Sequence, residues 1–567
     1  MAEPHVHEHE PEMKIKNPIL EKNIPQGTGL REYLSGKEET GFGVIKGRQP
    51  KLIKIHDGLK DWPKTLMMMP PITLSEGTVK RVIPPLGLAY IGGYLESQGI
   101  PFDICDCVVE ALDKERLIGE KTWQYGMSYD DIRKYIEKYN PDILGLSIMY
   151  SSDLHALYAV AQIAKEINPK MIVVAGGIHL SIYPKEVLGE AMMDGVPTID
   201  YIIRGEGEIR FAEFIKNYKK GVIDMNADGL CGWHEGQMFF NPQIGTIQNL
   251  DDMPLPAYHR LPMEKYFEWN VPFSPYPRGK RVMQLYTSRG CPVGCTFCSS
   301  TNFNKAYRGR SPENIIKEIK YYQDVYKIDE IQFADDNLTF DRSRSNAFFD
   351  MLKELNLPWC TPNGTMVNTL TEEVLQKMID SGLYQVTLSL DSGSAKTLKQ
   401  FHRKPVNLQK VPDLVNYLKP RGVLSHATLV VGMPGESIAD VEEGFEYAKT
   451  LMIDSIAVFI AQALPGSELY ERAIADGTID RFQARIIDTQ LNLINLSGIP
   501  REYLERRVRE YVAEFNQIVK ARDPESFDRK YAKHKDRLRK ICIGLAHHNV
   551  DGILKAYDSP PLETIGG

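Results

Sequence analysis

Three of the chain's eight cysteines lie close together in the segment SRGCPVGCTFCSS. They are Cys291, Cys295 and Cys298, with the spacing C-x3-C-x2-C. Thiolates are the preferred protein ligands of iron–sulfur clusters. Three thiolates on a [4Fe–4S] cluster leave one iron without a protein ligand, and a sulfonium compound with an amine and a carboxylate can chelate that iron. An electron from the cluster can then cleave a carbon–sulfur bond of the sulfonium, so the segment predicts S-adenosylmethionine chemistry.

The alternatives for this segment are a structural zinc site or plain buried cysteines. Zinc sites normally take four ligands in paired CxxC groups, and the sequence has neither a second pair nor a His at finger spacing. Eight cysteines in 567 residues do not make a disulfide framework. We therefore expect a reducing, cytoplasmic location and one dedicated metal site. The other cysteines are scattered, at Cys105, Cys107, Cys231, Cys360 and Cys542.

The cysteine pattern resembles that of the radical S-adenosylmethionine superfamily, and the resemblance covers residues 280–475. It implies that the cluster splits S-adenosylmethionine reductively into a 5′-deoxyadenosyl radical. Members of that superfamily more often have a glutamate at the position of Asp391, and the shorter aspartate side chain reaches less far toward the ligand. Isolated Asp and Gly residues at strand ends are more often turn or cap residues. The implied S-adenosylmethionine contacts are adenine at Phe297, ammonium at Asp335, Asp336 and Asn337, ribose and carboxylate at Asp391 and Ser392, and the adenine region again at Gly432 and Pro434.

A second pattern lies in the N-terminal half, where Ser147-Ile148-Met149 is followed after 26 residues by Gly176-Gly177. This resembles the S-x-L…GG pattern of cobalamin-binding domains, as do the phrases PPLGLAYIGGYLESQG, GGIHLSIYPKEVL and DYIIRGEGE. Any α/β sheet can supply a Ser and a glycine pair, so a generic or vestigial nucleotide-binding domain is the alternative. The resemblance implies cobalamin contacts from Ser147, Tyr150, Gly176, Gly177, His179, Gly205 and Glu206.

The chain departs from one feature of cobalamin domains. Domains that ligate cobalt through histidine carry D-x-H-x-x-G after the first strand, but the loop at 72–87 contains no His. Asp153-Leu154-His155 imitates the fragment after the third strand and lacks the Gly. We therefore predict cobalt without a histidine lower ligand, its lower face covered by the 72–87 loop or by residues 150–153. His179 is expected at the corrin periphery or tail.

The elements that must position these residues alternate along the chain. Short apolar runs separated by helical stretches predict βαβ units with ligands at the carboxyl ends of parallel strands. We expect an α/β protein with a doubly wound, Rossmann-like cobalamin-binding domain and a partial (β/α)6 TIM-type barrel. The expected boundaries are an N-terminal extension at 1–60, the cobalamin domain at 61–250, a linker at 251–280, the barrel at 281–475 and a C-terminal helical subdomain at 476–567.

Composition limits the kinds of partner. The net charge of −7 gives no reason to expect a nucleic-acid surface, and no apolar stretch reaches the 18 residues of a membrane span. The N-terminus is polar and acidic, unlike a signal peptide. Arginines 308 and 310 are expected either to meet a carboxylate or phosphate or to be solvated. Trp359, Tyr384 and His402 are expected to line the substrate pocket or to lie in the core.

The domain order resembles the cobalamin-dependent radical S-adenosylmethionine enzymes. The resemblance implies that one S-adenosylmethionine methylates cobalamin and a second is cleaved to abstract hydrogen from a small-molecule substrate. The substrate radical then takes methyl from methylcobalamin, at unactivated carbon or phosphinate phosphorus, with electrons from a donor such as flavodoxin or ferredoxin. The first alternative is cyclisation or rearrangement without methyl transfer, as in the anaerobic magnesium-protoporphyrin monomethyl ester cyclase. The second is a corrinoid-binding regulator.

Overall fold

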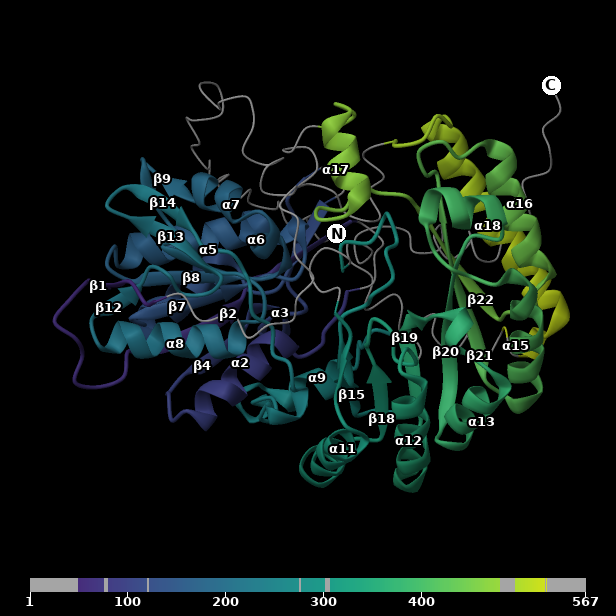
Figure 1. The fold of residues 1–567 in the computed structure, drawn as a ribbon, viewed down its shortest axis with the longest axis horizontal. Helices are drawn as coiled ribbons and strands as arrows, with labels where there is room; N and C mark the ends of the chain where they lie inside the picture. The colour runs from purple at the N-terminus through teal and green to yellow at the C-terminus, as the bar shows by residue number, and fades with distance from the viewer. Residues whose placement is uncertain are drawn as a thin grey trace, which may run out of the picture.

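The computed structural model describes residues 49–75, 80–119, 122–274, 277–300, 306–479, 495–525 and 527. It contains two α/β units side by side, one built on a seven-stranded sheet and the other on a six-stranded sheet (Figure 1). The expectations for the first 48 residues and for the chain beyond 527 lie outside the described residues. Within the described ranges, no helix is both long and apolar enough to cross a membrane.

The seven-stranded sheet has the doubly wound topology that the sequence predicts. Five strands are parallel, and their spatial order in chain numbering is 2-1-3-4-5, with β2 and β7 adjacent at the point where the winding reverses. Ligands of such sheets bind outside the strand ends at this point. Across the sheet the order is β14 (Gln237–Phe240), β13 (Leu230–His234), β11 (Tyr201–Ile203), β8 (Ile172–Gly176), β7 (Ile143–Ser147), β2 (Thr65–Met69) and β4 (Asp103–Asp106).

Strand β2 shows why the sheet is covered on both faces. Its side chains alternate, so Met67 packs in one hydrophobic cluster with residues of α2 (Leu86–Ser97) and α8 (Gly207–Lys219). Leu66 and Met68 face the opposite cluster, with residues of α4 (Tyr129–Tyr139) and α5 (Leu154–Ile167). An apolar run without polar alternation is the pattern of a strand buried on both sides.

Several elements of the first unit were not expected from the sequence. Strands β13 and β14 extend the sheet antiparallel to β11. A three-stranded sheet joins β3 (Ile72–Ser75), β6 (Thr122–Tyr125) and β5 (Glu115–Leu117). The end of the predicted N-terminal extension carries a strand, because β1 (Leu52–Lys54) pairs with β12 (Val222–Asp224) of the cobalamin-binding unit.

The six-stranded sheet is parallel throughout and its strands follow chain order, as the predicted (β/α)6 barrel requires. Pairing within the described residues does not join its two edge strands, so the barrel is open. Its strands are β15 (Val282–Leu285), β18 (Glu330–Phe333), β19 (Trp359–Thr365), β20 (Leu383–Asp391), β21 (Leu424–Val431) and β22 (Ser455–Ile460). Its covering helices include α11 (Pro312–Tyr326), α12 (Arg342–Leu352), α13 (Glu372–Asp380), α15 (Val411–Leu418) and α16 (Ile438–Thr450).

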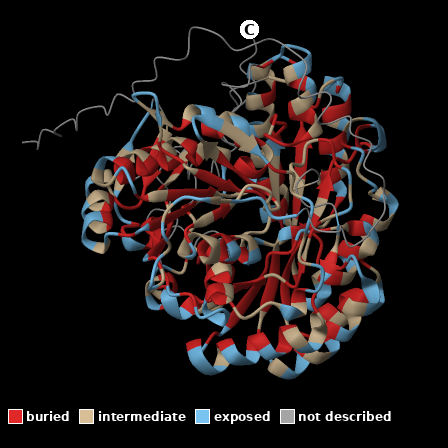
Figure 2. Ribbon diagram, turned by 60° about the vertical axis from the view of Figure 1, so that its left-hand side comes forward, coloured by how far each residue is buried: buried red, intermediate tan, exposed pale blue. Residues whose placement is uncertain are grey.

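The described part of the C-terminal region is helical and belongs to the barrel's core. Helix α18 (Arg501–Arg522) lies along α16 (Figure 1). The Tyr511 ring stacks on Phe445 with 3.9 Å between centroids. Buried residues run through both sheets, and exposed ones lie on the outer faces of the helices (Figure 2).

The segment predicted to be a linker is packed firmly against both units. The Ala257 N–H donates to Ala89 O of α2 at 2.8 Å, and a Cβ on Gly93 would lie 2.1 Å from Leu255 O. Glycine at 93 therefore lets this segment cross helix α2 at backbone distance. Tyr258 is 1% exposed and packs on Tyr322 of α11, at 5.5 Å between ring centroids.

Candidate active site

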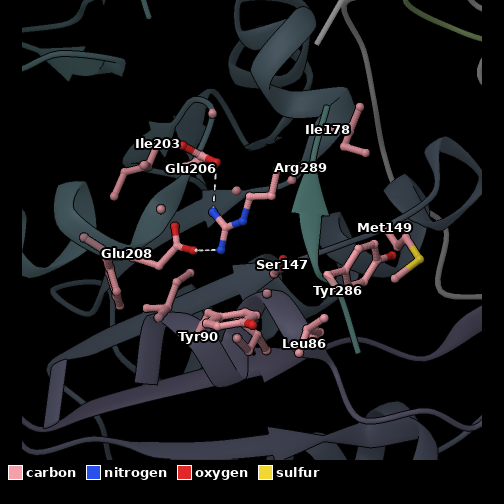
Figure 3. Close-up of a pocket in the computed structure, with 18 of the residues that line it drawn as sticks. Leu86, Tyr90, Ser147, Met149, Ile178, Ile203, Glu206, Glu208, Tyr286 and Arg289 are labelled. Atoms are coloured by element: carbon pink, nitrogen blue, oxygen red, sulfur yellow. Dashed lines mark hydrogen bonds and ion pairs between the residues drawn. The ribbon is translucent and has the colours of Figure 1, made fainter. Parts of the chain in front are cut away.

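A cavity of about 400 Å³ lies between the two units and is lined by the carboxyl ends of strands from both. This volume is within the range of small-molecule and cofactor sites. The lining from the first unit includes Met67, Ser147, Gly176 and Gly205, and that from the barrel includes Gln284, Tyr286, Ser288 and Asp336. Most of the lining is apolar, and the charged members are Glu206, Glu208, Arg289 and Asp336 (Figure 3).

Five of the seven predicted cobalamin contacts line this cavity, namely Ser147, Gly176, Gly177, Gly205 and Glu206. They follow strands β7, β8 and β11, next to the reversal of the winding. Gly177 has φ +125° and ψ 172°, and a Cβ there would lie 2.2 Å from Ile148 O. The glycine is therefore required by the backbone conformation and by the close approach of the Ile148 backbone at the end of β8.

The other two predicted contacts lie elsewhere. His179 is buried, with its Nδ1 2.8 Å from the Ser151 hydroxyl, and Tyr150 is 44% exposed; neither lines the cavity. His155 is held by Thr73 and Gln124, away from the cavity.

The sequence analysis predicts cobalt without a histidine ligand, and the residues of the described cavity wall can be compared with that prediction. Histidine is missing from the described residues of that wall. From the predicted covering loop, Ile83, Pro84, Leu86 and Gly87 do line it. These residues give that part of the wall an apolar surface, and the absence of a histidine ligand to cobalt stays a prediction.

The three cysteines lie on the segment between β16 (Ser288–Arg289) and β17 (Arg308–Gly309), at the mouth of the barrel. None of the three forms a disulfide in the described part of the chain, and each is partly or fully buried. Among the residues with described placement, no three His, Cys, Asp or Glu side chains are arranged to hold a single metal ion. Three cysteines on one loop instead suit a larger iron–sulfur cluster. Burial raises the pKa of Cys295 to about 12, so cluster binding must displace its proton.

The two neighbouring aspartates after β18 have different surroundings. Asp335 is buried, and its carboxylate accepts hydrogen bonds from the Thr287 N–H and hydroxyl, at 3.1 and 2.7 Å, and from the Ser288 hydroxyl at 2.5 Å. Asp336 is exposed to the open cavity. Asn337 is buried, and its Oδ1 has no partner in the described structure. Asp335 therefore holds Thr287 and Ser288 at the start of β16 in place, while Asp336 is the carboxylate that is open to a ligand.

At the end of β20, Asp391 has the left-handed φ of +61° and forms a buried ion pair with Lys404. Its Oδ1 also accepts a 3.0 Å hydrogen bond from the Thr428 hydroxyl. The Ser392 hydroxyl accepts the Ser394 N–H at 3.0 Å. Burial alone would lower the pKa of Lys404, but the charge of Asp391 raises it above its usual value. The ammonium of Lys404 therefore stays charged beside the cysteine loop, a feature that the sequence analysis did not identify.

The remaining predicted S-adenosylmethionine contacts surround the third cysteine. The Phe297 ring packs on a cluster that includes Val430 and Met433, and it meets the buried His402 edge-on at 5.3 Å between ring centroids. Gly432 has φ +80°, and its N–H donates to Glu436 at 2.6 Å. Pro434 follows in the same turn, which the Glu436 N–H closes on Met433 O.

Two groups of residues with open alternatives are now placed. Trp359 and Tyr384 are core residues: the Trp359 indole donates to Ser381 O, and the Tyr384 hydroxyl donates to Glu330. His402 is buried as well and does not line the cavity. Arginines 308 and 310 are buried and meet carboxylates of the chain itself, Glu206 and Glu318 respectively.

The sequence analysis missed the contact that joins the two units at the cavity. Arg289 donates to Glu206 at 2.8 Å and to Glu208 at 2.7 Å, and its guanidinium lies over the Tyr90 ring (Figure 3). The only sequence signal is the position of Arg289, two residues before the first cysteine. Tyr286 also lines the cavity, and burial raises its pKa well above the usual range.

Comparisons with known proteins agree with this two-unit site. The B12 binding domain model matches residues 75–215, and the Radical SAM superfamily model matches residues 285–448. Cytidylyl-2-hydroxyethylphosphonate methyltransferase of Streptomyces wedmorensis is 32% identical over 540 residues, covering 89% of this chain and 98% of that protein. An uncharacterized methyltransferase of Pyrococcus horikoshii is 32% identical over 80% of this chain and 92% of its own. The anaerobic magnesium-protoporphyrin IX monomethyl ester cyclase of Rubrivivax gelatinosus is more distant, with 28% identity over 68% of this chain and 66% of its own.

Solved structures share the fold at low identity. OxsB with aqua-cobalamin and S-adenosylmethionine bound has a TM-score of 0.61 and 15% identity, covering 84% of this chain and 71% of its own. TsrM of Kitasatospora setae with cobalamin and a [4Fe-4S] cluster bound has a TM-score of 0.58 and 14% identity, covering 73% and 79%. The matched domains and the full-length relative confirm the family, its cofactors and the predicted fold class. The chain belongs to the cobalamin-dependent radical S-adenosylmethionine methyltransferases.

Proposed function

We propose that this enzyme transfers a methyl group to an unactivated carbon, or to a phosphinate phosphorus, of a small-molecule substrate. The supporting observation is the single cavity that the strand ends of both units share, with the base of the cysteine loop in its wall. The near full-length similarity to a methyltransferase favours methyl transfer over cyclisation, since the cyclases match about two thirds of this chain.

The bound cofactors supply the chemistry: two S-adenosylmethionines, two electrons and a substrate R–H give R–CH3, S-adenosylhomocysteine, methionine and 5′-deoxyadenosine. The substrate's hydrogen ends on 5′-deoxyadenosine, and its new methyl comes from the first S-adenosylmethionine by way of cobalamin. We further propose a flavodoxin or ferredoxin as the one-electron donor and the cytoplasm as the location. The described cysteines form no disulfides, which supports a reducing compartment.

The chain's own residues have distinct tasks in this proposal. Cys291, Cys295 and Cys298 hold the cluster, and the charged Lys404 lies next to their loop. Asp336 presents an unpaired carboxylate toward the cavity for the ammonium of S-adenosylmethionine, while Asp335 fixes the strand beside it.

On the opposite wall, the backbone at Ser147, Gly176, Gly177 and Gly205 admits the cobalamin. The apolar lining keeps water away from the radical. Exclusion of water from a closed site protects reactive intermediates from side reactions, so it is part of the site's task.

The test uses S-adenosylmethionine with a labelled methyl group, the anaerobic enzyme with both cofactors, a chemical reductant, and a small-molecule extract as the substrate source. The proposal predicts equal amounts of S-adenosylhomocysteine and 5′-deoxyadenosine, together with label in a new small molecule. Formation of 5′-deoxyadenosine without S-adenosylhomocysteine would support cyclisation or rearrangement instead.

A further inference from the structure

Two buried arginines lie at the base of the cysteine loop. Strands β16 and β17 form a short antiparallel ribbon in which Arg289 pairs directly with Arg308. The loop that carries the three cysteines leaves the barrel at the first strand and returns at the second. The positions of these two arginines therefore determine how the loop is held over the cavity.

Both arginines bind one carboxylate from the other unit. Glu206 follows β11, immediately before helix α8, in the cobalamin-binding unit. It accepts a hydrogen bond from Arg289 at 2.8 Å and a bidentate pair from Arg308 at 2.9 and 2.9 Å. Its Oε2 also accepts the Ile247 N–H at 2.8 Å, so both of its oxygens are engaged. Bidentate pairs between arginine and carboxylate fix orientation as well as distance.

The charges explain why this acid is needed. Two arginines opposite each other in a ribbon repel one another, and here they are buried, with 19% and 7% of their side chains exposed. Glu206 lies between them, and Glu208 adds the second negative charge, so the cluster is neutral overall. Although burial alone would raise it, the hydrogen bonds from Arg308 and the charge of Arg289 lower the pKa of Glu206 to about 2.

We propose that Glu206 is a positioning residue that fixes the cysteine loop against the cobalamin-binding unit. Through that contact it sets the distance and orientation between the two cofactor sites. This role differs from the direct cobalamin contact that the sequence resemblance implies for Glu206. It rests on the proposed function, because alignment matters only if both cofactors act on one substrate.

The test compares Glu206→Gln with Glu213→Gln. The first variant keeps the shape of the side chain and removes the charge between the two arginines. Glu213 lies on the same helix α8, where its exposed side chain pairs only with Lys216, so its variant makes the same chemical change away from the site. Arg308→Lys is a second test, because lysine keeps the charge but cannot form the bidentate pair.

Three readouts need no identified substrate. In the apo-proteins, hydrogen exchange should rise at residues 286–290 and 306–310 in Glu206→Gln and Arg308→Lys but not in Glu213→Gln. In proteins loaded with both cofactors, EPR should show a weaker magnetic interaction between the reduced cluster and cob(II)alamin. With S-adenosylmethionine and reductant alone, the rate of S-adenosylhomocysteine formation should fall by about 10- to 100-fold, since small misplacements have effects of that size.

The outcomes separate the two proposals. If the wild-type protein binds no cobalamin or no cluster, the proposed function fails, and the hydrogen-exchange comparison still decides whether Glu206 fixes the loop. If Glu206→Gln and Arg308→Lys keep both cofactors and match Glu213→Gln in all three readouts, the positioning role of Glu206 is wrong.

Discussion

Substitution of Gly177 by alanine should destabilise the cobalamin-binding unit even when no cofactor is present. The residue has φ +125° and ψ 172°, a region of backbone space that is open essentially only to glycine. A Cβ would also lie 2.2 Å from Ile148 O and 3.3 Å from the Ile148 carbonyl carbon, both backbone atoms. Backbone strain of this kind costs about 1–3 kcal/mol. The contact can be relieved only if the backbone at the end of β8 moves, so we expect the free energy of unfolding to fall by at least about 3 kcal/mol in total.

Gly176→Ala is the matched control one residue earlier. A Cβ there would meet only Ile203 O, at an ordinary 3.6 Å, and the backbone does not have positive φ. The apo-protein should therefore keep its stability to within about 0.5 kcal/mol. Because Gly176 lines the cavity, its added methyl group should still weaken cobalamin binding. One variant thus affects the fold and the other only the ligand.

The assay is thermal unfolding of the two apo-variants, followed by titration with cobalamin monitored by absorbance. For a domain of about 150–250 residues, such as the cobalamin-binding unit, a loss of about 3 kcal/mol corresponds to a decrease of about 6–12 °C in apparent Tm. We expect that decrease for Gly177→Ala alone and reduced cobalamin occupancy for both variants. An unchanged apparent Tm for Gly177→Ala would refute the argument from backbone geometry.

Three further substitutions test other parts of the site. Asp335→Asn should lower the free energy of unfolding in denaturant by about 1–3 kcal/mol, because the Asp335 carboxylate accepts three hydrogen bonds. Asp336→Asn should keep its stability and bind S-adenosylmethionine more weakly. Burial lowers the pKa of His402 to about 4, so only the unfolded chain takes up a proton at this residue as the pH falls through 6.5. The free energy of unfolding of the apo-protein should therefore fall by about 2 kcal/mol between pH 8 and pH 5. His402→Phe should abolish that loss, and an equal loss in the variant would contradict the assignment. Alanine at each of Cys291, Cys295 and Cys298 should abolish cluster binding, measured as iron and sulfide content and as 5′-deoxyadenosine formed; retention of full iron content would contradict it.

Local patterns predicted the main elements of the fold well. Short apolar runs separated by helical stretches predicted βαβ units, and the strand Thr65–Met69 and the helix Leu154–Ile167 are elements of this kind. Burial on two faces or on one leaves a clear trace in the sequence. The short β13 and β14 were not predicted. They extend the sheet antiparallel, and their partners are decided by tertiary contacts rather than by residue type.

The sequence predicted which kinds of residue form the site, but not which of two adjacent residues would bind the ligand and which would hold the structure. Asp335 and Asp336 are indistinguishable in the sequence, yet the first is hydrogen-bonded to Thr287 and Ser288 and the second faces the cavity. The contact between Arg289 and Glu206 joins residues 83 positions apart. No local period or spacing reports such a contact, because it depends on how two separately folded sheets meet.

Different contacts at the interface between the two units contribute stability and alignment. The crossing at Ala257 and Tyr258 buries aromatic and backbone groups and supplies apolar packing, which is not directional. An apolar contact in place of Glu206 would add similar stability at lower desolvation cost, since buried ion clusters are weak contributors to stability. It would also let the cysteine loop slide against the cobalamin-binding unit. A neutral, bidentate cluster at the cavity wall is therefore best explained by a requirement for fixed geometry, which is the requirement of an enzyme whose two cofactors must reach one substrate.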